Sequence, residues 1–204
     1  MLKRTTINHI ENLLKKNPEW NVLDIGCGYR ANKKATVISD IQDFSNYYKD
    51  KKFIQIKDKN LPFKDKEFDF VISSHVIEHV EDFEFFIKEL ERISSKGYIE
   101  LPSRLGDNLV FENKKDHVWW FLYDDINSKL LVSKKNQLLE PFINVSTGKL
   151  FEKIFRESFV IELYWEEKID YQVDNSIYQN EITKLSFFKI VKKYLSKKIR
   201  SFYK

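Results

Sequence analysis

Short apolar runs alternate with helical patterns over the first half of this chain, and this alternation restricts the fold more than any other feature. Five runs have the length and composition of strands: residues 21–26, 35–40, 53–57, 68–74 and 97–102. The fourth, "FDFVISS", is apolar throughout, as in a strand buried on both faces. Apolar residues at helical spacing mark residues 6–16 and about 82–95. Strands and helices in alternation predict an α/β fold with a parallel sheet and right-handed crossovers.

The second half of the chain is less regular. Residues 103–150 are polar and aromatic without a clean period, and residues 150–157 have a helical pattern. The stretch 158–173, "SFVIELYWEEKIDYQV", predicts two antiparallel strands on either side of Glu166-Glu167, at the C-terminal edge of the sheet. Residues 182–203 predict a final helix.

The composition favours a single domain. With 204 residues, of which 42% are hydrophobic, the chain can bury one sizeable core. The single cysteine, Cys27, excludes an internal disulfide, and no apolar run approaches the ~20 residues of a membrane span. The N-terminal stretch lacks the apolar segment of a signal peptide, so we expect a cytoplasmic protein.

Positive charge gathers towards the C-terminus. Residues 182–204 carry eight Lys or Arg and no acid, and subtracting this +8 from the formal net charge of +4 leaves −4 for residues 1–181. A mildly acidic body is not expected to bind nucleic acid. We therefore expect one domain, 1–181, followed by a basic amphipathic helix, 182–204. This helix packs on the body or on a second subunit of a homodimer, or it docks on the anionic inner membrane surface.

A glycine turn follows the strand at residues 21–26. In "VLDIGCGYR", Gly26 and Gly28 allow the backbone to approach a ligand closely. Ala31 stands where the dinucleotide fingerprint has its third glycine, and no long helix precedes the next strand. A pyrophosphate needs the free N–H groups of a helix N-terminus, so this loop argues against NAD or FAD.

Acids follow the next two strands. Asp40 ends the strand at 35–40, where a carboxylate can accept both hydroxyls of a ribose. Asp58 follows the strand at 53–57, where it could meet an adenine amino group. A solvated strand end or a turn would also explain either acid alone. Because the carboxyl ends of parallel strands share one crevice, the two acids and the glycine turn support one another.

The stretch "SSHVIEHV", residues 73–80, has two interpretations. Read as H-x-x-E-H it is the inverted zinc-protease signature, with His75 and His79 as ligands and Glu78 as base. Such a site needs a long helix and a third ligand, whereas the residues before His75 form a strand. We therefore expect no metal and interpret the stretch as a strand end followed by the first turn of a helix. A zinc hydrolase using these three residues is kept as an alternative.

These features, in this order, resemble the class I S-adenosylmethionine-dependent methyltransferases, and the methyltransferase type 11 group in particular. The resemblance spans residues 20–102. It rests on the glycine-turn stretch 22–28, on Asp40, and on Asp58 followed by residues 61–63. It also rests on the stretch 68–79 and on Glu89, Leu90 and Arg92, which precede residues 97–100. It implies a Rossmann-like fold with a mostly parallel seven-stranded sheet, and an insertion at about 103–150 that forms the acceptor side. It also implies S-adenosylmethionine as cofactor and a small-molecule acceptor.

The resemblance further implies where the cofactor binds. The expected cofactor-binding residues are Asp24, Gly26, Cys27, Gly28, Asp40, Ile41, Asp58, Lys59, Ser74 and His75. Among them the two glycines would line the methionine part, Asp40 would bind the ribose and Asp58 would lie near the adenine. The short loop after Gly28 departs from the commoner pattern with a full helix, so contacts from that helix are not carried over.

The acceptor is less constrained than the cofactor. Nucleobase amine methylation in this fold typically uses an Asn/Asp-Pro-Pro-aromatic stretch, where this chain has Ser-Ser-His-Val. A hydroxyl acceptor needs a base, and His79 and His117 are the candidates. Trp119 and Trp120 either stack on a sugar or belong to the core. We expect O-methylation of a sugar or sugar-nucleotide of surface-glycan synthesis. A cofactor-binding partner protein without activity is the first alternative.

Overall fold

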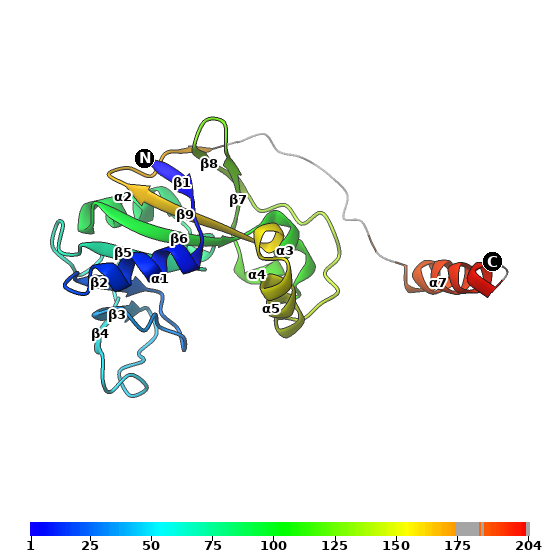
Figure 1. Cartoon of the computed structure of the whole chain (residues 1–204), viewed down its shortest axis with the longest axis horizontal. Helices are drawn as coiled ribbons and strands as arrows, with labels where there is room; N and C mark the ends of the chain where they lie inside the picture. The colour runs from blue at the N-terminus through cyan, green and yellow to red at the C-terminus, as the bar shows by residue number, and fades with distance from the viewer. Residues whose placement is uncertain (174–183, 185, 203–204) are drawn as a thin grey trace.

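A computed structural model describes residues 1–173, 184 and 186–202 of the chain, and its centre is a seven-stranded sheet (Figure 1). In sheet order the strands are β4 (Lys52–Gln55), β3 (Val37–Asp40), β2 (Val22–Ile25), β5 (Phe70–Ser74), β6 (Lys96–Pro102), β9 (Val160–Glu166) and β1 (Leu2–Arg4). The strands from β4 to β6 are parallel, and β9 runs antiparallel to both of its neighbours. The predicted α/β fold with a mostly parallel sheet is therefore confirmed.

The antiparallel edge is built from different strands than the sequence predicts. The first half of the predicted pair forms β9, but the second half, β10 (Tyr171–Val173), leaves the sheet. Beside β9 lies β1, which pairs Leu2 with Trp165 and buries that leucine. The predicted pairing of the two C-terminal strands is wrong because the chain turns away at Glu167, which has a φ of 63°. A three-residue strand such as β1 is too short to show a period of its own.

Two hydrophobic layers cover the sheet, one on each face. On one face α1 (Ile7–Lys16) buries Ile10 and Leu14 against alternate residues of the strands, Phe70 among them. On the other face α2 (Phe83–Ile93) packs Ile87 and Leu90 on the residues between. Both helices lie where their apolar spacing predicts them. Their caps are also readable in the sequence, because the side chains of Thr6 and Asp82 accept hydrogen bonds from the first turns.

Residues 103–159 build the part of the molecule that follows the carboxyl end of β6. Here α3 (Arg104–Leu109) and α4 (Asn113–Asp116) precede the hairpin of β7 (Trp119–Asp124) and β8 (Lys129–Lys134), and α5 (Val145–Ile154) and α6 (Arg156–Phe159) follow it. Figure 1 shows α3, α4 and α5 gathered beside the sheet. β10 joins this hairpin as a third strand, parallel to β8. The helical pattern at 150–157 is confirmed by α5 and α6.

The predicted final helix is present as α7 (Phe187–Phe202). Residues 182, 183, 185 and 203 of that prediction lie outside the described part of the chain. Within the described residues, no helix combines the length and the apolar character that crossing a membrane requires.

Side chains hold the short loop that follows Gly28. The buried carboxylate of Asp24 accepts a hydrogen bond from the Asn32 backbone N–H at 2.6 Å. The Tyr48 hydroxyl donates to the Gly28 carbonyl and accepts from the Ala31 N–H, both at 2.9 Å. Burial raises the pKa of Asp24 to about 7, against the lowering effect of its hydrogen bond from Asn32. The loop therefore contains a carboxyl group that changes charge near neutral pH.

This carboxyl group makes stability depend on pH. The folded protein binds the Asp24 proton up to about pH 7, whereas the unfolded chain releases it near 3.8, so the free energy of unfolding should fall as pH rises between these values. Asp24→Asn keeps an oxygen for the Asn32 N–H and removes the charge. We expect this variant to lose that fall and to be more stable than the wild type at pH 8 in urea titrations.

The control is Asp50→Asn, which changes an exposed aspartate in the loop between β3 and β4. Its unfolding free energy should follow the wild type at every pH. Parallel curves for Asp24→Asn and the wild type from pH 4 to 8 would contradict the burial argument.

Candidate cofactor and acceptor site

A cavity of about 750 Å³ opens at the carboxyl ends of β2, β3, β4 and β5. It lies where the chain order of the sheet reverses, which is where open α/β sheets bind ligands. Six of the ten predicted cofactor residues line it: Gly26, Asp40, Ile41, Asp58, Lys59 and His75. The other four, Asp24, Cys27, Gly28 and Ser74, lie outside its lining. The fold thus brings the predicted residues of β2 to β5 to one cavity, and their contacts with a cofactor stay a prediction.

The glycine turn is packed tightly against the next crossover. Gly26 has a φ of 70°, and a Cβ atom there would lie 2.3 Å from a methyl group of Val76. Its N–H donates to the Ser39 carbonyl at 2.8 Å, which fixes the turn on β3. Position 26 therefore requires glycine for both its backbone angle and its space.

Asp40 is fixed by the same turn. One carboxylate oxygen accepts from the Gly28 N–H and the other from the Gln42 N–H, each at 3.0 Å. A carboxylate oxygen can accept about two hydrogen bonds, so each keeps one site for a ligand hydroxyl. Gly28 acts here through its backbone, at a φ of 47°, rather than by lining the cavity.

Two further predicted residues support the turn from behind. Asp24 binds the loop backbone, as described above. Cys27 is 6% exposed, and burial together with the nearby acids raises the pKa of its thiol to about 12. A protonated, buried thiol is a packing residue rather than a nucleophile.

Aromatic and charged side chains form the remaining rim. Phe85 and Phe86, from the first turn of α2, line the cavity. The Lys59 ammonium lies 2.7 Å from the Asp82 carboxylate and 4.6 Å from the centre of the Phe85 ring. The sequence marked Phe86 only as a core position of the helix and did not single out Phe85, because cavity-facing and core-facing aromatic residues look alike in a helical pattern.

His75 lies between two carboxylates at the end of β5. Its Nδ1 is 3.3 Å from Glu78 Oε1 and its Nε2 is 3.1 Å from Glu100 Oε1. Burial works against the imidazolium, but the hydrogen bonds to Glu100 and Glu78 outweigh it and raise the pKa of His75 to about 10. Both ring nitrogens are therefore engaged, and His75 is a cation in the wall of the cavity.

The helix required by the zinc-hydrolase alternative is not formed. Residues Ile77–His79 make only a single 3₁₀ turn, η1, and α2 begins later at Phe83. The expectation that Glu78 and His79 lie in the first turn of the next helix is wrong, because the side chain of Asp82 caps α2 instead. With His75 occupied by two carboxylates, the set His75, Glu78 and His79 does not present a shared metal face.

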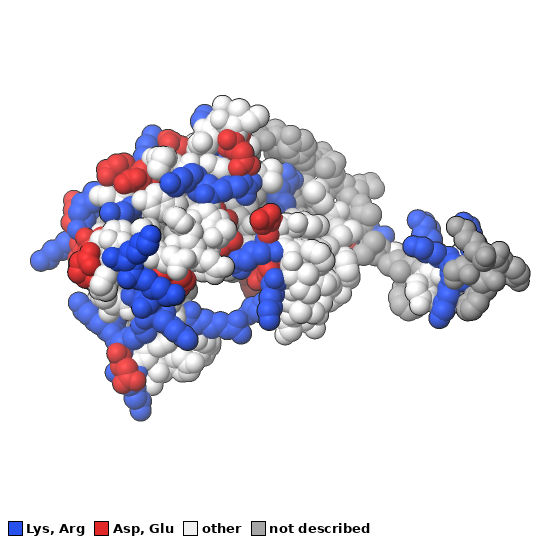
Figure 2. Space-filling view, viewed as in Figure 1, with Lys and Arg blue, Asp and Glu red and all other residues white. Residues whose placement is uncertain are grey.

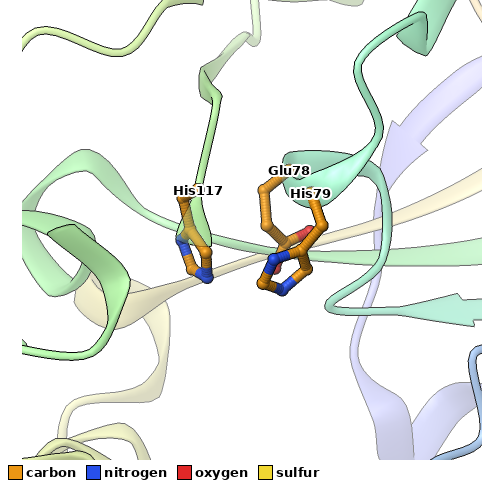
Figure 3. A group of neighbouring side chains, drawn as sticks. All are labelled: Glu78, His79 and His117. Atoms are coloured by element: carbon orange, nitrogen blue, oxygen red, sulfur yellow. The ribbon is translucent and has the colours of Figure 1, made fainter. Parts of the chain in front are cut away.

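Glu78, His79 and His117 converge beside the cavity (Figure 3). The two imidazole rings meet edge to face with their centres 4.5 Å apart. The backbone brings them together, because the Val118 N–H donates to the Glu78 carbonyl at 2.8 Å. His79 lines the cavity, whereas Glu78 is fully buried and His117 is 9% exposed. The two histidines proposed as bases are therefore neighbours, although 38 positions separate them in the sequence.

Asp107, which the sequence did not single out, holds His117 in place. Its carboxylate makes a short hydrogen bond with His117 Nδ1, accepts from Trp120 Nε1 at 2.5 Å and lies 2.8 Å from Lys135 Nζ. Burial opposes its ionisation, but the bonds from His117 and Lys135 prevail and lower the pKa of Asp107. No local pattern links α3 to His117, so only the fold reveals this partnership.

Trp119 and Trp120 belong to the core. They are 8% and 2% exposed, and their indole N–H groups donate to the Val80 carbonyl and to Asp107. Of the two interpretations given for these tryptophans, the structure therefore supports core packing and not stacking on a sugar.

A family model and several solved structures are similar to this chain. Residues 23–99 match a family model described as a methyltransferase domain. No curated protein matches the sequence. Similar solved structures include the PH0226 protein of Pyrococcus horikoshii, with 20% identity over 78% of this chain and 89% of that one at a TM-score of 0.45.

Two more solved structures are similar to this chain. A SAM-dependent methyltransferase of Thermotoga maritima is 15% identical over 79% of this chain and 96% of its own, with a TM-score of 0.44. The YcgJ protein of Bacillus subtilis is 18% identical over 48% of this chain and 52% of its own, with a TM-score of 0.40. The chain thus spans about half the length of this last protein.

The matched region contains the glycine turn, both acids and the stretch from Phe68 to His79. The sheet has seven strands and is mostly parallel, as the resemblance implies. Residues 23–99 therefore match a methyltransferase domain, and the chain has a Rossmann-like α/β fold with a mostly parallel seven-stranded sheet.

Proposed function

We propose that this chain transfers a methyl group from S-adenosylmethionine to a hydroxyl group of a small molecule, with a sugar or sugar-nucleotide of surface-glycan synthesis as the acceptor class. The observation that carries the proposal is that one cavity is lined by Gly26 of the glycine turn, by both acids and by His79. We call the part beside Gly26, Asp40 and Asp58 the cofactor end and the part beside His79 the acceptor end. The cavity volume of about 750 Å³ is in the range of small-molecule sites.

The cofactor end of the cavity suits a nucleoside with an aliphatic sulfonium. Asp40, with one free acceptor site on each oxygen, suits the two ribose hydroxyls. Asp58 and the aromatic rings of Phe85 and Phe86 suit an adenine, which combines a polar edge with flat apolar faces. Gly26 lines the cavity without a side chain, which suits the methionine part next to the strand end.

The acceptor end suits a polar molecule with several hydroxyls. Glu81 and Asp82, which follow His79 closely in the chain, line the cavity together with it. His79 Nδ1 is 2.9 Å from the Asp116 carbonyl, so Nε2 is the nitrogen left to act on an acceptor. Methyl transfer is an in-line displacement in which positioning and removal of the acceptor proton are the protein's tasks. We place this proton removal at His79 and His117.

Cofactor binding is tested by calorimetry with S-adenosylhomocysteine. We expect one equivalent to bind to the wild type and the affinity to fall at least tenfold in Asp40→Ala, because two ribose hydrogen bonds are lost. Asp50→Ala, on the exposed loop, should bind as the wild type does. Thermal melts show whether Asp40→Ala is folded. No binding to the folded wild type would overturn the proposal.

Acceptor chemistry is tested by transfer from labelled S-adenosylmethionine to a panel of sugars and sugar-nucleotides. We expect an O-methyl ether and a turnover at least tenfold lower in His79→Asn, with unchanged affinity for S-adenosylhomocysteine. His9→Asn, which changes a histidine of α1, is the matched control. Cofactor binding without transfer to any acceptor would instead favour a non-catalytic partner protein, and methylation of amines alone would contradict the hydroxyl class.

We further propose that α7 docks the enzyme on an anionic membrane surface. Its residues 187–202 include six Lys or Arg and no acid. Phe188, Leu195 and Ile199 are 83%, 50% and 56% exposed. Figure 2 shows Lys and Arg side chains around the paler, uncharged part of this helix. An exposed apolar strip among cations is typical of helices that lie in a lipid headgroup layer.

Docking is tested by co-sedimentation with vesicles that contain anionic lipid. The full chain should sediment, and the truncation 1–181 and the double variant Leu195→Asp/Ile199→Asp should not. The full chain should bind only weakly to neutral vesicles, because each Lys or Arg near an anionic surface contributes about 1 kcal/mol to binding and neutral lipid does not provide this contribution. Equal partitioning of all three proteins would reject docking, and a concentration-dependent dimer lost in the double variant would assign the strip to a second subunit.

A further inference from the structure

We propose that Glu78, His79 and His117 bind a divalent transition-metal ion at the acceptor end of the cavity. One ligand atom from each of the three residues lies within 4.8 Å of the others. Two imidazoles and one carboxylate are a ligand set that Zn²⁺, Fe²⁺ and their neighbours share. The inference deepens the proposed function, because it assigns a chemical role to the two histidines placed beside the acceptor.

Both imidazoles are oriented as metal ligands usually are. His79 Nδ1 is bonded to the Asp116 carbonyl, and His117 Nδ1 is bonded to the Asp107 carboxylate. An acceptor on Nδ1 fixes the tautomer with the proton there and leaves the Nε2 lone pair for a ligand. Asp107 is itself anchored by Lys135 and Trp120, so this second set of contacts is complete before any ion binds.

Glu78 supplies an independent indication of a missing partner. Its side chain is fully buried, and Oε2 has no hydrogen-bond partner among the described residues. Its other oxygen, Oε1, faces His75 at 3.3 Å. A buried carboxylate oxygen without a partner is costly, and a carboxylate oxygen of Glu78 lies within 4.8 Å of a ring nitrogen of each histidine. An ion between the three side chains would satisfy it.

The geometry requires only a small closure. Ligand atoms lie about 2.0 to 2.2 Å from such an ion, hence roughly 3 to 3.5 Å from one another. With a present limit of 4.8 Å, the ligand atoms that lie farthest apart have to approach by about 1.3 to 1.8 Å. His79 is exposed and can move, whereas Glu78 and His117 are buried and define the place of the ion.

Three protein ligands leave positions open for an acceptor oxygen. Coordination to the ion lowers the pKa of a hydroxyl, so its proton is released to water. The oxygen then attacks the methyl carbon of the sulfonium, the new C–O bond forms and the S–CH₃ bond breaks, and its electron pair returns to sulfur as S-adenosylhomocysteine. With the ion bound, His79 and His117 promote proton removal from the acceptor through the ion, and this role replaces the direct proton transfer proposed above.

The test is a titration of the full, untagged chain with ZnCl₂ by calorimetry, without cofactor. We expect one equivalent to bind, and the affinity to fall at least tenfold in Glu78→Gln, His79→Asn and His117→Asn. His9→Asn is the matched control and should bind as the wild type does. Visible absorption of Co²⁺ in place of Zn²⁺ gives a second readout, which His117→Asn should abolish.

Thermal melts without metal show whether each variant folds. If the variants at the buried residues do not fold, the variant His79→Asn, at an exposed residue, provides the test. Binding that is absent, or unchanged in the folded His79→Asn and His117→Asn proteins, would overturn the ion site. S-adenosylhomocysteine is titrated into the same samples. If the protein binds S-adenosylhomocysteine but not Zn²⁺, the ion site is rejected and the methyltransferase proposal stands. If it binds Zn²⁺ but not S-adenosylhomocysteine, only the methyltransferase proposal is rejected.

Discussion

The buried carboxylate of Glu100 determines the shape of the site. It lies on β6 in the interior of the sheet, where a charge is stable only when it is fully paired. It bonds His75, Arg156 and the Tyr98 hydroxyl. Although burial opposes it, the bond to His75 lowers the pKa of Glu100 to about 2, so the charge persists. The imidazolium of His75 is held in return, with its backbone at a φ of 55°.

This left-handed residue sets the direction of everything that follows β5. After His75 the chain places Val76 over Gly26 and then enters the 3₁₀ turn that carries Glu78 and His79. The segment that follows His75 therefore contributes to both the cofactor end and the acceptor end of the cavity. Arg156 and Glu162 extend the same pairing to α6 and β9, which connects the site to the antiparallel edge.

The sequence predicted the features that depend on neighbours along the chain. The strands from β2 to β6, the helices α1 and α2, the glycine turn and the acids after β3 and β4 all have local signals, since apolar spacing, caps and turn residues act over a few positions. The partnership of β1 with β9 and that of Asp107 with His117 join distant segments and leave no such signal. Residues 119 and 120 show a further limit, because an aromatic pair in a polar stretch looks the same whether it faces a ligand or the core.

The place of β1 also matters for the order in which the protein can form. Leu2 of β1 and its partner Trp165 of β9 are 163 positions apart in the sequence. During synthesis the first strand emerges from the ribosome long before its only neighbour in the sheet, so it has to wait unpaired while the parallel strands assemble. Closing so long a loop is slow, because its entropy is lost before the contacts are gained. The nascent chain would therefore carry a nearly complete cavity whose sheet edge is still open.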